Sequence, residues 1–174
     1  LRSMTQRLLL IGLMITTAIA ENKRLSFEDV QGKSPFEYAR LGMMQWQADK
    51  NAYLAWGKGD YKGDIVEVAF PAKDTTKIVD EGTLVVNGEK LKVSRFSLDK
   101  TGTKLLLLSN REKIWRHSYY GTYHVLDIAT QTIEQVSNDN TRLRNVKMSP
   151  DGSKVAYVRE DNNLYVYDLN RNRE

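Results

Sequence analysis

The sequence contains no cysteine and only two histidines, His117 and His124, among its 174 residues. Without cysteine the chain cannot form a disulfide, a thiol nucleophile or a thiolate metal site. Two histidines leave little material for a zinc centre, so we predict neither a metal nor another cofactor. The sequence also lacks the Gly-x-Ser-x-Gly motif that carries the nucleophilic serine of α/β-hydrolases. We therefore assign no catalytic residue to it.

A strong excess of charge of one sign is missing as well. Lysine and arginine number 26 against 22 acidic residues, a formal net charge of +4. Arg2 and Arg7 supply two of these charges from a segment that we expect to be removed, which leaves +2. Such a small excess gives no support to nucleic-acid binding. With 41% hydrophobic and 28% charged residues, the chain has the composition of a soluble domain with a core.

The main apolar run, residues 8–15, lies within the first 20 residues. Arg7 precedes it, and residues 18–20 read Ala-Ile-Ala. This order of a basic end, a short apolar stretch and small residues is typical of a secretory signal peptide. We predict a signal peptide over residues 1–20, cleaved after Ala20, and an extracytoplasmic location, periplasmic or secreted. An uncleaved N-terminal membrane anchor or a buried core helix are the alternatives, because length separates these classes only softly.

Residues 21–44 form a predicted lead-in segment. Ser26 is a candidate N-cap for a short helix within residues 26–41, and Gly32 and Pro35 interrupt that helix early. Beyond Trp46 the pattern changes to short apolar or alternating runs separated by turn residues. Runs of four to eight residues that are rich in β-branched and aromatic types predict strands.

A repeat organises the remaining chain. Residues 96–105 align with residues 148–155, and a weaker copy begins at Trp46, so the copies are spaced by 50 and 52 residues. Periods of this length are typical of β-propellers. In the last copy, Pro150 fixes its own φ, Asp151 can accept hydrogen bonds from nearby amides, and Gly152 tolerates a positive φ. Each copy therefore predicts a tight turn between two antiparallel strands.

Each copy also carries later strands. Residues 123–130 match residues 164–171, residues 60–70 occupy the same place in the first copy, and residues 132–136 suit a fourth strand. The predicted fold is all-β. Residues 45–174 would form a partial β-propeller of four-stranded antiparallel blades, about two complete and one truncated. Because a propeller needs roughly four to eight blades to close, the sequence is interpreted as a fragment.

A more specific likeness lies between two of the predicted strands, where residues 115–119 read Trp-Arg-His-Ser-Tyr. Together with residues 149–159, this run resembles the N-terminal β-propeller region of dipeptidyl peptidase IV-type serine peptidases of the prolyl oligopeptidase group, in its bacterial form. The likeness covers about residues 25–174. The Ser-Pro-Asp-Gly turn is common to many propellers, whereas the run at residues 115–119 is much more specific.

The resemblance implies a function for the whole protein. Members of this family are extracytoplasmic peptidases that remove dipeptides from peptide N-termini, usually after proline or alanine. They join an eight-bladed propeller to a C-terminal α/β-hydrolase domain that carries serine, aspartate and histidine, and this domain is missing from the chain. The implied partners are peptide substrates with a free N-terminus and, for the full-length protein, a second copy in a homodimer. The fragment alone lacks the catalytic triad.

The resemblance also assigns a substrate-binding role to Arg116. In the family, the matching arginine helps to hold the substrate's carbonyl oxygen and the carboxylates that grip the free amine, and a guanidinium suits both tasks. A surface arginine at a strand end is the alternative interpretation. Trp115, His117 and Tyr119 are candidates for pocket or loop support, with a structural role favoured for His117. We interpret His124 as a packing residue.

Three further interpretations are open to test. Tyr119, Tyr120 and Tyr123 would either line a pocket or belong to the core, and residues 142–147, rich in lysine and arginine, are predicted to form a solvated turn. Glu112 and Glu160 should not be taken for the family's paired glutamates.

The alternative function is a non-enzymatic periplasmic propeller that acts as a binding or scaffold module. The run at residues 115–119 favours the peptidase.

Overall fold

The computed structural model describes residues 26–27, 42–47, 49–137 and 141–174. The chain divides into two units, Leu1–Arg40 and Leu41–Glu174. The predicted signal peptide lies outside the described residues, as does the predicted short helix apart from Ser26 and Phe27. Among the described residues, no helix has both the length and the apolar character needed to cross a membrane.

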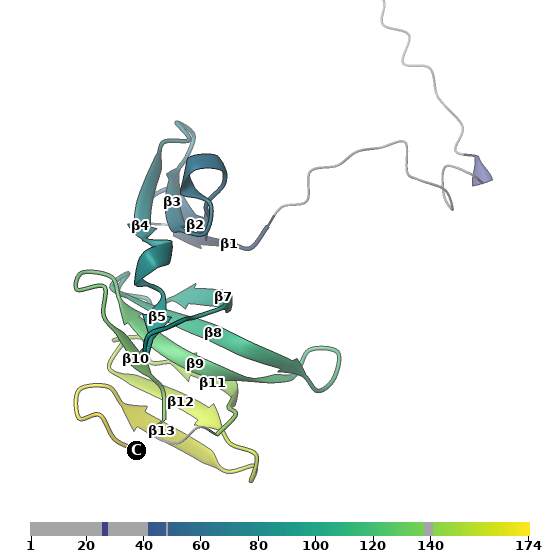
Figure 1. The fold of residues 1–174 in the computed structure, drawn as a ribbon, viewed down its shortest axis with the longest axis vertical. Coiled ribbons are helices and arrows are strands. Elements are labelled where there is room, and N and C mark those ends of the chain that lie inside the picture. Colours follow the sequence, from purple (N-terminus) through teal and green to yellow (C-terminus); the bar gives the residue numbers. More distant parts are fainter. Residues whose placement is uncertain (1–25, 28–41, 48, 138–140) are drawn as a thin grey trace, which may run out of the picture. The chain divides into compact units, whose positions relative to one another are not determined.

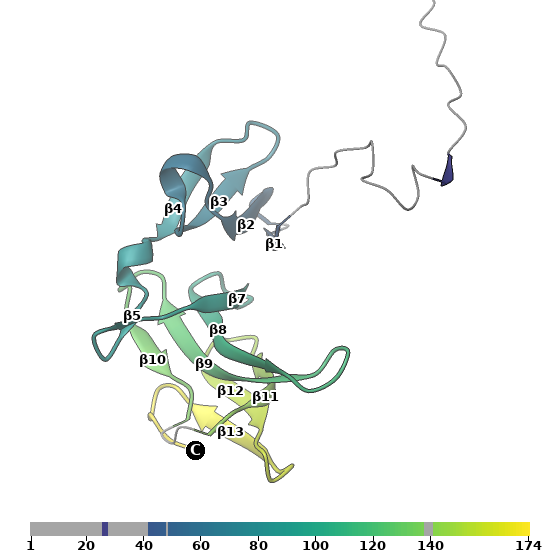
Figure 2. The same cartoon turned by 45° about the vertical axis from the view of Figure 1, so that its right-hand side comes forward.

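The second unit is built from antiparallel sheets that follow one another along the chain (Figures 1 and 2). The prediction of an all-β fold is confirmed, and so is its division into two four-stranded sheets and a shorter third one. The first sheet has the order β1-β2-β3-β4, the second β10-β9-β8-β7 and the third β11-β12-β13. The strands are β1 (Met44–Gln47), β2 (Ala52–Trp56), β3 (Ile65–Ala69), β4 (Thr75–Val79), β7 (Val93–Leu98), β8 (Lys104–Lys113), β9 (Tyr119–Asp127), β10 (Ile133–Gln135), β11 (Arg144–Met148), β12 (Lys154–Val158) and β13 (Leu164–Asp168).

Tight turns join the first two strands of the second and third sheets at the places that the repeat predicts. In the third sheet, Gly152 has a φ of 67°, and the Asp151 carboxylate accepts a hydrogen bond from the Ser153 amide at 3.1 Å. In the second sheet, Asp99 accepts hydrogen bonds from the amides of Thr103 and Lys104 at 2.9 and 3.0 Å. The carboxylates satisfy backbone donors that no strand partner reaches, which explains why aspartate recurs in these turns.

Two apolar clusters hold neighbouring sheets face to face. Leu105 and Leu107 pack with residues of the first sheet, including Leu54, whereas Leu106 and Leu108 pack with residues of the third sheet. Successive side chains of a strand point to opposite faces, so a strand that is buried on both faces needs an unbroken apolar run. The four consecutive leucines of β8 therefore mark the second sheet as the middle layer.

Between the first and second sheets, the chain forms a small connector of two short elements. These are the 3-10 turn η2 (Glu81–Thr83) and a hairpin of β5 (Val85–Val86) and β6 (Glu89–Lys90). We did not predict this hairpin, although Asn87-Gly88 between two strand-like dipeptides is a recognised turn signal. A further 3-10 turn, η1 (Gly59–Tyr61), precedes β3.

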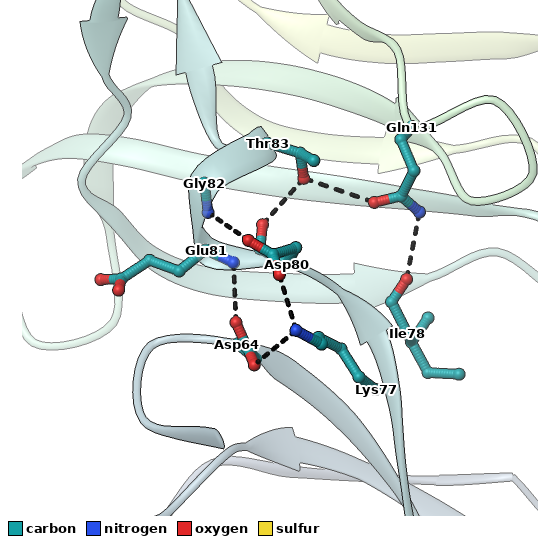
Figure 3. Close-up of polar contacts among 8 residues, drawn as sticks. All are labelled: Asp64, Lys77, Ile78, Asp80, Glu81, Gly82, Thr83 and Gln131. Atoms are coloured by element: carbon teal, nitrogen blue, oxygen red, sulfur yellow. Dashed lines mark hydrogen bonds and ion pairs between the residues drawn. The ribbon is translucent and has the colours of Figure 1, made fainter. Parts of the chain in front are cut away.

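Polar side chains brace the connector, and Figure 3 shows their contacts. Asp64 accepts a hydrogen bond from the Glu81 amide at 2.8 Å, and Lys77 bridges Asp64 and Asp80 at 3.6 and 2.6 Å. From the second sheet, the Gln131 amide donates to the Ile78 carbonyl at 3.1 Å (Figure 3). A glutamine in the outer turn of one sheet thus grips the last strand of the preceding sheet.

Replacing this glutamine should loosen the contact between the two sheets. Gln131 also donates to the Ile128 carbonyl at 2.7 Å and accepts from the Thr83 hydroxyl at 3.3 Å. We expect Gln131→Ala to lower the free energy of unfolding by about 1 kcal/mol in urea titrations, the net value of a typical protein hydrogen bond. Lys100→Ala, in an exposed turn, is the control and should change nothing. Equal stability of the two variants would contradict the bracing role.

The predicted solvated turn at residues 142–147 is wrong. Most of this segment belongs to β11, and Leu143 and Val146 are only 1% and 8% exposed. The charged side chains hid a strand, because the register of β11 shifts between Arg144 and Lys147, so that Leu143 and Val146 both pack into the same core cluster although they stand three positions apart.

Candidate functional site

The predicted site residues lie on the hairpin of β8 and β9, whose strands have ten and nine residues. The strands pair from Lys104 with Asp127 to Lys113 with Tyr119, while pairing of β8 with β7 stops at Ser109. The end of the hairpin consequently projects beyond its own sheet (Figures 1 and 2). Two hydrogen bonds close the loop, from the amides of Ile114 and Trp115 to the Ser118 carbonyl at 3.0 and 3.2 Å.

Arg116 sits at the tip of this hairpin and is exposed, with exposed Trp115 and His117 on either side. Trp115 is 71% exposed, which is unusual for so large an apolar side chain. The Arg116 guanidinium makes no hydrogen bond or ion pair with any residue that the structure describes. Its planar donors remain available to an external oxygen.

On one face of the hairpin, below its tip, two arginine side chains lie over the ring of the same tyrosine, Tyr119. The guanidinium carbon of Arg111 lies 4.6 Å from the ring centroid of Tyr119, and that of Arg95 on β7 lies 5.8 Å from it. Tyr123 follows on the same face and is buried in the core. Burial, together with the neighbouring Tyr119, raises the pKa of the Tyr123 phenol. Of the three tyrosines, Tyr123 is a core residue, while Tyr119 is half-buried.

Arg142 tethers the opposite face of the hairpin to the third sheet. Its guanidinium forms ion pairs with Glu112 on β8 and with Glu160, and stacks over the Tyr120 ring at 5.2 Å. The hydrogen bonds to Glu112 and Glu160 raise the pKa of Arg142. Both glutamates are thus occupied by an arginine of the chain itself.

Backbone hydrogen bonds at Gly121 also attach the hairpin to the third sheet, and the absence of a side chain at this position makes them possible. The amides of Gly121 and Leu143 donate to each other's carbonyl oxygens at 3.0 and 2.9 Å. A Cβ at position 121 would approach the Leu108 side chain to 2.2 Å and the Ser109 carbonyl oxygen to 3.0 Å. Any larger residue at this position of β9 would push β8 and β9 apart.

The two histidines differ sharply in environment. His117 is exposed in the loop, whereas His124 on β9 is 3% exposed, so its interpretation as a packing residue is confirmed. Burial lowers the pKa of His124 to about 4, and its Nδ1 atom has no hydrogen-bond partner among the described residues. His124 is neutral at pH 7 and lines a pocket together with Glu89, Lys90 and Lys92.

Sequence reasoning identified the tip but missed the arginines at its base. Arg111 lies two residues before Lys113 on β8. The alternation of side chains along a strand would place both residues on the same face of the hairpin. Arg95 and Arg142 come from other strands, and only the three-dimensional structure brings them to the hairpin. In the described part of the chain, no group of three or more histidine, aspartate or glutamate side chains is arranged to hold a metal ion.

Residues 99–174, which include the whole hairpin, match the family model described as the dipeptidyl peptidase IV (DPP IV) N-terminal region. The predicted resemblance is confirmed. What this chain shares with dipeptidyl peptidase IV-type peptidases is the N-terminal region, and the run at residues 115–119 lies inside the matched segment.

Similarity to dipeptidyl peptidases is also found in curated relatives and in a solved structure. A probable dipeptidyl-aminopeptidase B of Phaeosphaeria nodorum is 39% identical over 173 residues, which cover 84% of this chain and 17% of the relative. Its counterpart in Emericella nidulans is 36% identical over 111 residues, 63% of this chain and 12% of the relative. The chain therefore spans less than a fifth of the length of these relatives.

The crystal structure of Porphyromonas gingivalis dipeptidyl peptidase 4 superposes with a TM-score of 0.65 at 20% identity, over 74% of this chain and 18% of that one. This likeness concerns the fold. The predicted partial β-propeller is confirmed by it and by the observed sheets.

Proposed function

We propose that this chain is the N-terminal propeller portion of an exported serine exopeptidase that releases Xaa-Pro or Xaa-Ala dipeptides from the N-termini of peptides. In this proposal the chain restricts access and recognises the amine end of the substrate, while an α/β-hydrolase domain outside the chain performs the cleavage. The names of the relatives, dipeptidyl-aminopeptidase and dipeptidyl peptidase, support the substrate class. The order of residues in the first 20 positions supports export.

One observation carries the site assignment. Arg116 stands at the tip of a projecting hairpin, exposed and without a hydrogen bond or ion pair to any described residue. An arginine that merely completed the surface would have no need of so long a hairpin, whereas a guanidinium that reaches toward a substrate carbonyl does. The tethers of Arg142 and Gly121 hold the base of this hairpin, so the tip is carried on a defined support.

Reading the coding region beyond Glu174 tests the proposed function. We expect further blades of about 50 residues, followed by a Gly-x-Ser-x-Gly nucleophile elbow and then by the aspartate and histidine of a triad. Blades without any nucleophile elbow would instead identify a non-enzymatic propeller that acts as a binding or scaffold module.

A further inference from the structure

A second candidate site lies at the base of the hairpin, where the first strands of all three sheets come together. It is a pocket of about 330 Å³ lined by residues of β1, β7, β8, β9 and β11. Leu106, Leu108 and Val146 supply apolar walls, and Arg95 and Lys147 supply positive charge. None of the lining residues that the structure describes is an aspartate or glutamate.

Two arginines lie close to Tyr119, which lines this pocket; Arg95 is itself a lining residue, whereas Arg111 reaches the pocket only through its contact with the tyrosine ring. The guanidinium groups of Arg95 and Arg111 both lie over the ring of this tyrosine, at 5.8 and 4.6 Å from its centroid. Cation–π contacts favour each arginine singly, but the two like charges repel each other. An anion close to both groups would offset that repulsion.

The described part of the chain does not supply this anion. Neither Arg95 nor Arg111 forms an ion pair or hydrogen bond with a described residue. Glu112, the acidic residue next to Arg111 along the chain, faces the other side of the hairpin and pairs with Arg142. Both guanidinium groups are exposed and can accept a ligand without rearrangement of the core.

We propose that this pocket binds a carboxylate group of a peptide. Arg95 and Arg111 donate charge-assisted hydrogen bonds to the two carboxylate oxygens, a planar arrangement that suits guanidinium groups. The aliphatic part next to the carboxylate packs on Tyr119 and on the apolar walls. This combination of an apolar floor and a cationic rim fits a peptide better than a bare inorganic anion. The site is separate from Arg116 and does not depend on the amine end of the peptide.

Binding of blocked peptides to the full-length protein that carries this chain tests the proposal. The probes are N-acetylated tetrapeptides, so that the proposed amine recognition plays no part. The first contains an internal glutamate and a C-terminal amide, the second has glutamine in place of the glutamate, and the third has glutamine with a free C-terminal carboxylate. Calorimetry at low ionic strength should show binding of the first or the third peptide and much weaker binding of the second. The stronger of the two identifies the source of the carboxylate, a side chain or a chain end.

Variants assign the binding to the two arginines. We expect Arg95→Gln and Arg111→Gln each to weaken carboxylate binding by about tenfold, as for the loss of a charged hydrogen bond, with unchanged thermal unfolding. Arg171→Gln, an exposed arginine in a turn of the third sheet, should bind like the parent chain. Arg111→Glu should reverse the preference, so that a lysine-containing blocked peptide binds better than the glutamate peptide.

Three results would overturn the assignment. They are equal affinity for the glutamine amide and the carboxylate peptides, no effect of either arginine substitution, and inhibition by inorganic phosphate as strong as that by the glutamate peptide. Failure of these tests would leave the proposed role of Arg116 untouched, because acetylated peptides do not report on it.

Discussion

Arg116→Ala should lower kcat/KM for Xaa-Pro substrates by about 10- to 100-fold in the full-length protein that carries this chain, the range expected for loss of a charged hydrogen bond to substrate. The guanidinium is exposed at the hairpin tip and bonds to no described residue, so its removal costs the fold nothing. Thermal unfolding of the variant should therefore match that of the parent protein. Steady-state kinetics with a chromogenic Xaa-Pro substrate measure the effect.

Two further variants separate a binding role from a general loss of charge. Arg171→Ala removes an exposed arginine from a turn of the third sheet and should leave the kinetics unchanged. Arg116→Lys keeps the charge but loses the planar donors, so we expect it to recover only part of the activity. Unchanged kinetics of Arg116→Ala would refute the assignment and leave this residue an ordinary surface arginine.

His124 should make the folded chain sensitive to mild acid. Unfolded, this histidine takes up a proton near its ordinary pKa of 6.5, whereas burial lowers the pKa to about 4 in the folded chain. Between these two values the unfolded chain binds more protons, so the free energy of unfolding falls as the pH falls through this window. The loss attributable to His124 is about 3 kcal/mol between pH 7 and pH 4. Urea titrations across this pH range measure it.

The matched variants exploit the chain's two histidines. His124→Phe removes the titrating group from the buried position and should flatten the pH dependence between pH 6.5 and 4, apart from the contribution of carboxylates. His117→Gln removes the exposed histidine of the loop and should keep the slope of the parent chain. If His124→Phe retained the full slope, another group would have to be the source of the acid sensitivity.

Much of the fold follows from local sequence. The Asp-Gly pair at residues 151–152 and the aspartate at position 99 each predict a tight turn, because such a turn needs a carboxylate acceptor or a residue that tolerates positive φ. The four leucines of β8 indicate a strand buried on both faces. These features depend on neighbours in the chain, which a single sequence displays.

The contacts between sheets could not be predicted in the same way. Gln131 has a φ of 57° and reaches the Ile78 carbonyl from a turn 53 residues later in the chain, and nothing in the local pattern marks it. The strand at β11 was missed because its charged residues dominate the sequence while Leu143 and Val146 carry the burial. Residue type alone does not say which face of a short mixed segment another sheet will cover.

The candidate site also has one part that the sequence predicts and another that only the structure shows. The resemblance selected Arg116, and the structure places it at an exposed tip. The pair of Arg95 and Arg111 on Tyr119 required the pairing of β7, β8 and β9, because the two arginines stand 16 positions apart in the sequence. Long-range sheet pairing, and not any motif, creates this second group of charges.

Release of an N-terminal dipeptide is the most direct test of the proposed function. The full-length protein that carries this chain should be incubated with a peptide that has a free N-terminus and proline at its second position. The masses of the products are then measured by mass spectrometry. We predict the loss of one dipeptide from this peptide and none from its N-acetylated form. An intact free peptide, or equal cleavage of the acetylated one, would contradict the proposal that this chain recognises the amine end of a substrate for a dipeptide-releasing peptidase.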